Sequence, residues 1–223
     1  MNQFDQSITR SEQSILSTNK VLKNTYILLA MTLLFSAATA GISMMLNLPS
    51  PGMIITLVGY FGLLFLTTKF RDSSMGIVCV FALTGFMGMT LGPILNMYLV
   101  NFANGSELIM TALGGTGVIF LALSAYALTT RKDFSFMSGF LMTGILVAFL
   151  AGIGAAIFSI PALSLGVSAM FIMLMSGMIL YQTSEIIHGG ETNYIMATVS
   201  LYISIFNLFV SLLQILGVMG SDD

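Results

Sequence analysis

Residues 194–219 read YIMATVSLYISIFNLFVSLLQILGVM and contain no charged side chain. A helix needs about 20 apolar residues to cross the hydrocarbon core of a bilayer, so this stretch is long enough to span one. Its polar residues recur at steps of four, three, four and three, which places them on one helical face, called here the polar stripe. The members of the polar stripe are Ser200, Ser204, Asn207, Ser211 and Gln214. Because lipid satisfies polar groups poorly, we expect the stripe to face other helices and this helix to lie at the centre of a bundle.

The polar stripe has two interpretations. Its side chains can be hydrogen-bonding contacts between helices, each worth roughly 0.6 kcal/mol. They can instead line a polar cavity or an ion path through the bundle. The spacing fits both interpretations and favours the first.

The composition of the whole chain is typical of a membrane protein. Only 7% of the 223 residues are charged, 57% are hydrophobic, and the mean hydropathy is +0.98. A soluble domain carries about 25% charged residues, so membrane lipid must be the solvent for most of this surface. The net charge is −2 and no basic block is present, which argues against nucleic acid as a partner.

Further apolar stretches precede the last one, and each ends at proline, glycine or charged residues. The longest, 134–187, has Glu185 as its only charge and is too long for one span, so we divide it at Ser159-Ile160-Pro161. The expected spans are 26–46, 53–68, 75–99, 108–129, two within 134–187, and 194–219. The sequence therefore predicts an all-α integral membrane protein, a seven-transmembrane helix bundle with the last helix central. We expect the transmembrane domain to cover residues 24–219. An N-terminal tail at 1–23 and a short C-terminal tail at 220–223 would flank it.

The basic residues predict the orientation of the helices, because Lys and Arg concentrate in cytoplasmic loops. All seven lie before the first span, between the second and third, or between the fourth and fifth: Arg10, Lys20, Lys23, Lys69, Arg71, Arg131 and Lys132. With seven spans, these three places fall on one side of the membrane. We therefore expect a cytoplasmic N-terminus and a periplasmic C-terminus.

One short segment before the last span gathers potential metal ligands. Glu185, His188 and Glu191 could approach one another and bind a metal, or form a proton-sensitive latch, since histidine titrates near neutral pH. Alternatively the segment is a solvated turn, in which glycine ends one helix and Thr192 or Asn193 begins the next. Two acids and one histidine are few for a metal site, so the turn is favoured and no metal or cofactor is expected.

Motifs of common enzyme classes are missing from the sequence. There is no HExxH, Gly-x-Ser-x-Gly or Walker A pattern, and the chain has one histidine. No acidic residue lies in the middle of a span, where a proton-coupled transporter would carry one. We therefore assign no catalytic residue and do not expect an enzyme.

The third span has two further features. Gly88 and Gly92 have the GxxxG spacing that lets two helices approach closely, either within the bundle or between two copies of the chain. Packing within the bundle is favoured. Cys79 lies in an apolar run and is expected to be a buried hydrophobic residue.

Several segments of the chain resemble the Bax inhibitor-1 family. They read HGGETNYI at 188–195, ATVSLY at 197–202, NLFVSLL at 207–213 and LGPILN at 91–96. They are most similar to its bacterial YccA-like branch, whose members are named as modulators of the membrane protease FtsH. The resemblance implies seven helices with the last one central, a bacterial inner-membrane location, and FtsH as the partner of a non-catalytic protein.

The resemblance also implies an alternative function, because other members of the family are described as pH-sensitive calcium leak channels. Those members use a buried aspartate pair and a basic residue that often follows it. The matching positions here are Gln182, Ser204 and Gln214, none of which is charged. In a pair of aspartates, repulsion between like charges raises one pKa, so the pair can respond to pH. Glutamine and serine side chains do not titrate near neutral pH. A calcium or cation leak is therefore the alternative, and modulation of FtsH the main expectation.

Overall fold

Seven long helices make up the part of the chain that the computed structural model describes. The description covers the backbone of residues 3–220 and the side chains of Leu16 and residues 18–220. The helices are α1 (Gln3–Met45), α2 (Met53–Lys69), α3 (Ser74–Asn101), α4 (Gly105–Thr130), α5 (Ser138–Ile157), α6 (Pro161–His188) and α7 (Tyr194–Met219), with a 3₁₀ turn, η1 (Ser135–Met137), before α5. The predicted all-α fold with seven helices is confirmed.

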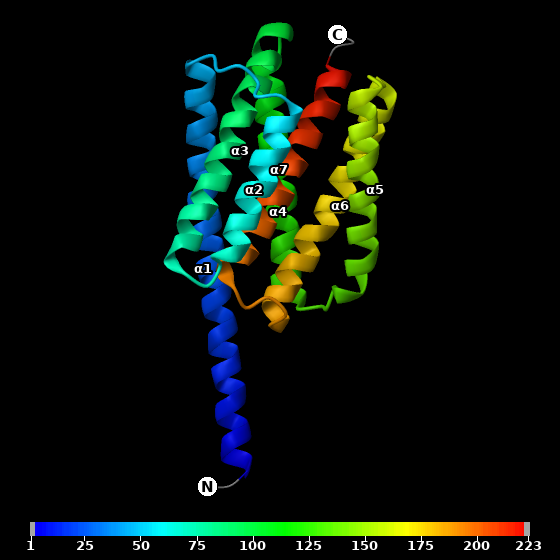
Figure 1. The fold of residues 1–223 in the computed structure, drawn as a ribbon. Helices are drawn as coiled ribbons and strands as arrows, with labels where there is room; N and C mark the ends of the chain where they lie inside the picture. The colour runs from blue at the N-terminus through cyan, green and yellow to red at the C-terminus, as the bar shows by residue number, and fades with distance from the viewer. Residues whose placement is uncertain (1–2, 221–223) are drawn as a thin grey trace.

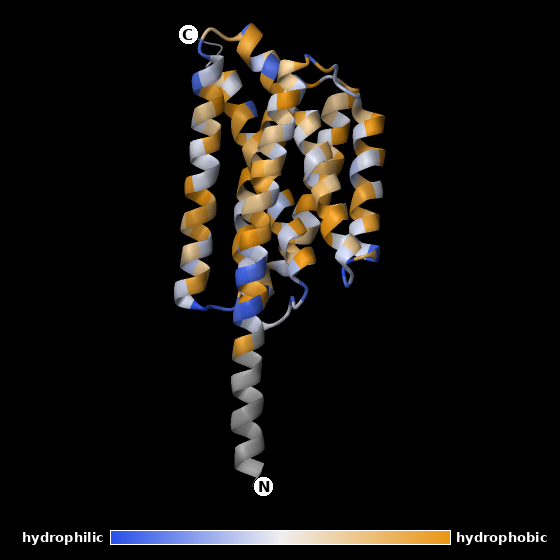
Figure 2. Cartoon of the chain, turned by 90° about the vertical axis from the view of Figure 1, so that its left-hand side faces the viewer, coloured by the Kyte–Doolittle hydropathy of each residue, from blue (hydrophilic) through white to orange (hydrophobic). Residues whose placement is uncertain are grey.

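The helices have the length and surface of membrane spans. Six contain segments long and apolar enough to cross a bilayer, and α2, with 17 residues, is a shorter apolar helix. Large hydrophobic side chains such as Val58, Phe140 and Met173 point outward and are more than two-thirds exposed. Apolar residues follow the helices along their length, whereas hydrophilic residues gather at the two ends of the bundle (Figure 2). This surface suits a protein whose outer faces contact lipid.

Helix α7 lies at the centre of the bundle, as predicted. It packs against α1, α3, α4 and α6, and Figure 1 shows it enclosed by the other helices. The ring of Tyr202 is almost fully buried, and its hydroxyl group lies 2.7 Å from the Ser36 hydroxyl of α1. The same hydroxyl lies 3.3 Å from the carbonyl oxygen of Thr84 on α3. Polar contacts thus reach α7 from two helices at one level.

Local sequence explains where α6 begins and ends. Pro161 occupies its first turn, where the missing N–H of proline costs no hydrogen bond. Gly189 ends it with a φ of 76°, a left-handed conformation that favours glycine. The predicted division of 134–187 therefore falls in the loop between α5 and α6.

The predicted N-terminal tail is not separated from the first span by a break in the backbone. Helix α1 starts at Gln3 and runs without interruption to Met45, so its N-terminal part extends beyond the other helices (Figure 1). Helix α7 ends at the opposite end of the bundle. In the predicted C-terminal tail, residues 221–223 lie outside the described residues.

Candidate functional site

Two buried polar side chains join the C-terminal half of α6 to the N-terminal half of α7. Ser204 donates a hydrogen bond from Oγ to Oε1 of Gln182, at 3.1 Å. Ser204 is 1% exposed and Gln182 is 9% exposed, so little solvent or lipid reaches the pair. The structure thus brings together two of the three positions that the family resemblance singled out.

The third position, Gln214, contacts the same helix farther along. Its Oε1 accepts a hydrogen bond from the Ser168 hydroxyl at 2.7 Å, and its amide nitrogen donates to Ser164. The two serines are one turn apart on α6, so they can hold both ends of one amide. We call the resulting line of contacts the α6–α7 seam; it consists of Ser164, Ser168, Gln182, Ser204 and Gln214.

The other members of the polar stripe have different surroundings. Asn207 donates to the carbonyl oxygen of Ile203 in its own helix, at 2.8 Å. Ser200 is partly buried and its carbonyl oxygen accepts from Ser204, at 3.1 Å, while Ser211 is buried. Hydrogen bonds from the stripe to α6 are therefore made at Ser204 and Gln214.

The α6–α7 seam is chemically neutral. Each of its contacts is an amide–hydroxyl hydrogen bond, and none of its five side chains titrates near neutral pH. Such contacts hold two helices together without the cost of a charge in the membrane, which is roughly 2.5–3.5 kcal/mol on insertion scales.

The sequence reasoning missed the polar contacts on the α1 side of the bundle. Thr32, Ser36 and Ser43 are spaced by four and seven residues and are all buried. Ser36 meets the Tyr202 hydroxyl, and Ser43 donates to the carbonyl oxygen of Met89 on α3, at 2.9 Å. That spacing on α1 is the same kind of signal as the polar stripe, and it could have identified this face.

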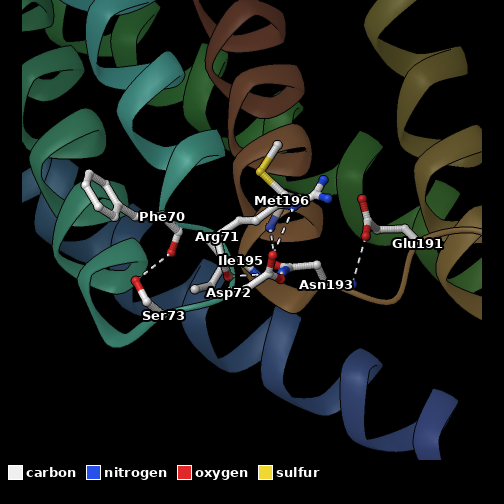
Figure 3. A network of polar contacts seen from close by, with 8 residues as sticks. All are labelled: Phe70, Arg71, Asp72, Ser73, Glu191, Asn193, Ile195 and Met196. Carbon is white, nitrogen blue, oxygen red and sulfur yellow. Dashed lines mark hydrogen bonds and ion pairs between the residues drawn. The ribbon is translucent and has the colours of Figure 1, made fainter.

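Asn193 ties the last helix to a neighbouring loop (Figure 3). Its side-chain oxygen accepts from the backbone N–H groups of Ile195 and Met196, at 3.0 and 3.1 Å, and so caps α7. Its amide nitrogen donates to the Arg71 carbonyl oxygen and to the Asp72 carboxylate, at 3.0 and 2.8 Å. One side chain therefore joins the start of α7 to the loop between α2 and α3.

The three weak candidates for metal ligands have separate partners. The Glu191 carboxylate accepts from the backbone N–H of Asn193, at 2.8 Å. The ring nitrogens of His188 lie 2.9 Å from the Ser184 carbonyl oxygen and 3.1 Å from that of Arg131. Glu185 lies against Gly190. Among the residues that the structure describes, no group of three His, Cys, Asp or Glu side chains could hold a metal ion.

The loop between α4 and α5 is fastened to the end of α6. The Ser184 hydroxyl donates to the Lys132 carbonyl oxygen at 3.2 Å and accepts from the Phe134 backbone N–H at 3.1 Å. Nearby, hydrogen bonds from the backbone N–H and the hydroxyl of Ser135 lower the pKa of Asp133, and the charge of His188 adds a smaller effect. Three loops are thus held at one end of the bundle.

Replacing Asn193 by alanine should destabilise the bundle by about 1–2 kcal/mol, because α7 loses its N-cap and the loop contact. The measurement is thermal unfolding of the purified protein in detergent. Thr192→Ala is the matched control, because the neighbouring threonine is exposed. Equal stability of the two variants would show that Asn193 does not anchor α7.

The fold and the α6–α7 seam define a seven-helix integral membrane protein whose central last helix is held by neutral hydrogen bonds. Residues 18–221 match the family model described as "Inhibitor of apoptosis-promoting Bax1". The chain belongs to the Bax inhibitor-1 family.

Relatives match over nearly the whole chain. "Modulator of FtsH protease YccA" of Escherichia coli strain K12 is 56% identical over 216 residues, which cover 97% of this chain and 98% of the relative. "Inner membrane protein YccA" of E. coli O6:H1 matches to the same extent. A Pseudomonas aeruginosa protein is 57% identical over 203 residues, 91% of each chain. The resemblance to the YccA-like branch is therefore confirmed.

Proposed function

We propose that this chain is a non-catalytic protein of the bacterial inner membrane that binds the FtsH protease and modulates its activity. The observation that carries the proposal is the 56% identity to a relative named as an FtsH modulator, over 97% of this chain. The neutral α6–α7 seam supports it, because the seam suits a structural core better than a reaction centre or a gate. Helix α1 supports it too, because its N-terminal part extends past the bundle, where another protein could reach it.

The proposal requires the N-terminus of α1 to lie in the cytoplasm, where the protease domain of FtsH would reach it. The test uses single cysteines introduced as Lys132→Cys and Glu107→Cys, in a Cys79→Ala background. Both positions are exposed, and they lie in or next to opposite loops of α4. A membrane-impermeant maleimide added to spheroplasts should label the cysteine at 107 and reach the one at 132 only after permeabilisation. The reverse pattern would place the N-terminus outside and remove the proposed contact.

The function itself is tested by the turnover of FtsH substrates in cells. The full chain should slow the degradation of other membrane substrates, because it competes for the protease. Deleting residues 1–16 should abolish this effect and lengthen the lifetime of the chain itself. Deleting residues 221–223, at the other end of the chain, is the control and should change neither rate. If the deletion of 1–16 also leaves both rates unchanged, the N-terminal segment is not what the protease engages.

A further inference from the structure

A pocket of about 320 Å³ opens at the end of the bundle where the basic residues lie. It is formed by the N-terminal part of α1 and the C-terminal ends of α4 and α6. Its lining consists of Thr18, Asn19, Leu22, Leu128, Arg131, Ile187 and His188. None of these residues belongs to the α6–α7 seam, so the pocket is a separate feature of the molecule.

The pocket lies at the level expected for lipid headgroups. Thr18, Asn19 and Leu22 precede the expected first span at 26–46, α4 ends at Thr130 and α6 ends at His188, so the three walls lie just outside the hydrocarbon core. The lining changes from Arg131 and Asn19 on the polar side to partly buried leucine and isoleucine on the apolar side. A ligand with a polar head and an apolar tail fits this order.

The charge around the pocket favours an anion. The described basic side chains all lie at this end of the bundle: Lys20, Lys23, Lys69, Arg71, Arg131 and Lys132. Four of the acids whose side chains the structure describes, Asp72, Asp133, Glu185 and Glu191, share this end, and none of them lines the pocket. Asp133 is close enough to His188 for the histidine charge to lower its pKa, but its carboxylate accepts a hydrogen bond from the Ser135 backbone N–H, at 2.8 Å. Among its described lining residues, the pocket therefore presents a guanidinium and no carboxylate.

The backbone of Arg131 is fixed at the rim of the pocket. Its φ is 49°, a left-handed conformation that ends α4, and its carbonyl oxygen lies 3.1 Å from Nε2 of His188. The guanidinium thus starts from an anchored Cα and remains exposed to a ligand. Arginine is well suited to phosphate because its planar fork donates two parallel hydrogen bonds.

We propose that this pocket binds an anionic phospholipid of the cytoplasmic leaflet. Arg131 donates to the phosphate, and Asn19 and Thr18 bond its remaining oxygens or the headgroup. Leu22 and Leu128 contact the acyl carbons of the lipid. The lipid joins α1 to α4 and α6, whereas α1 otherwise packs mainly on α3 and α7.

Native mass spectrometry of the delipidated full chain tests the proposal, with phosphatidylglycerol and phosphatidylcholine of identical acyl chains as probes. Phosphatidylglycerol should bind more tightly, and Arg131→Gln should weaken its binding about fivefold, the effect of one basic residue worth about 1 kcal/mol at a membrane surface. Lys132→Gln is the matched control, because it removes the same charge one residue away and does not line the pocket. It should retain the wild-type affinity.

Two further arms separate the pocket from its surroundings. Leu22→Trp fills the cavity without changing charge and should also abolish the preference for phosphatidylglycerol. An unchanged preference in this variant, or equal losses in Arg131→Gln and Lys132→Gln, would show that diffuse surface charge attracts the lipid. Inorganic phosphate should not displace the lipid. Displacement by millimolar phosphate would show a site for the free anion and would overturn the lipid assignment.

Discussion

Gly88→Leu should destabilise the bundle by about 3 kcal/mol, the upper part of the usual range for overpacking. A Cβ atom at Gly88 would collide with the carbonyl oxygen of Ser36 and the hydroxyl of Thr39 on α1. The Ser36 carbonyl is part of the α1 backbone and cannot rotate away as a flexible side chain can. The helices α1 and α3 must therefore move apart to make room for the leucine. One turn later, a Cβ at Gly92 would likewise meet Ser43. The GxxxG pair therefore packs within the bundle, as the sequence favoured.

The measurement for this variant is thermal unfolding in detergent, with Gly114→Leu as the matched control. Gly114 lies within α4, and a Cβ there would have no heavy atom within 4 Å. The control should therefore unfold close to the wild-type temperature. If both variants unfold alike, close approach of α1 and α3 does not limit stability. If Gly88→Leu instead dissociates a dimer and leaves each copy folded, the glycines form an interface between copies.

Combining Gln182→Asp with Ser204→Asp should make the stability of the bundle strongly dependent on pH. The oxygen atoms of Gln182 and Ser204 lie 3.1 Å apart, so two carboxylates placed there cannot both be ionised at low cost. At about pH 8 the double variant should lose roughly 2.5–3.5 kcal/mol for each charge that stays ionised. Its folded state takes up protons relative to the unfolded chain, so its stability should rise as the pH falls.

The comparison variant for this experiment is Gln182→Asn with Ser204→Asn, which has nearly the same shape and no charge. Its unfolding temperature should be the same at pH 5 and pH 8, like that of the wild type. Calcium flux into liposomes is the second readout, and the wild-type protein should show none above empty liposomes. If the wild-type protein conducts calcium and Gln182→Leu abolishes the flux, the protein is a leak channel. A calcium leak would then replace modulation of FtsH as its main function.

The helices of this protein can be predicted from its sequence because their length and their ends depend on the chemistry of neighbouring residues. Long apolar runs end where charge, proline or glycine appears, and Pro161 and Gly189 mark both ends of α6. The polar stripe also located Ser204 and Gln214, since unsatisfied polar groups are costly in lipid. Such patterns reveal which face of a helix must be covered.

The sequence does not reveal which helix covers that face. Ser204 and Gln214 contact α6, whereas Asn207 on the same stripe bonds its own helix. That outcome depends on helix crossing angles and on close approaches such as that at Gly88, which no spacing along one helix contains. The contact between Tyr202 and Ser36, 166 residues apart, was missed for the same reason. The pocket that we propose to bind a lipid likewise forms only because three distant segments meet.

Co-purification with FtsH from native membranes tests the central claim most directly. The membranes are solubilised in mild detergent, and the full chain is compared with the version lacking residues 1–16 and with an unrelated membrane protein of similar size. The full chain should retain FtsH, and the truncated version should retain much less. Recovery of no more FtsH with the full chain than with the unrelated protein would contradict its assignment as an FtsH partner.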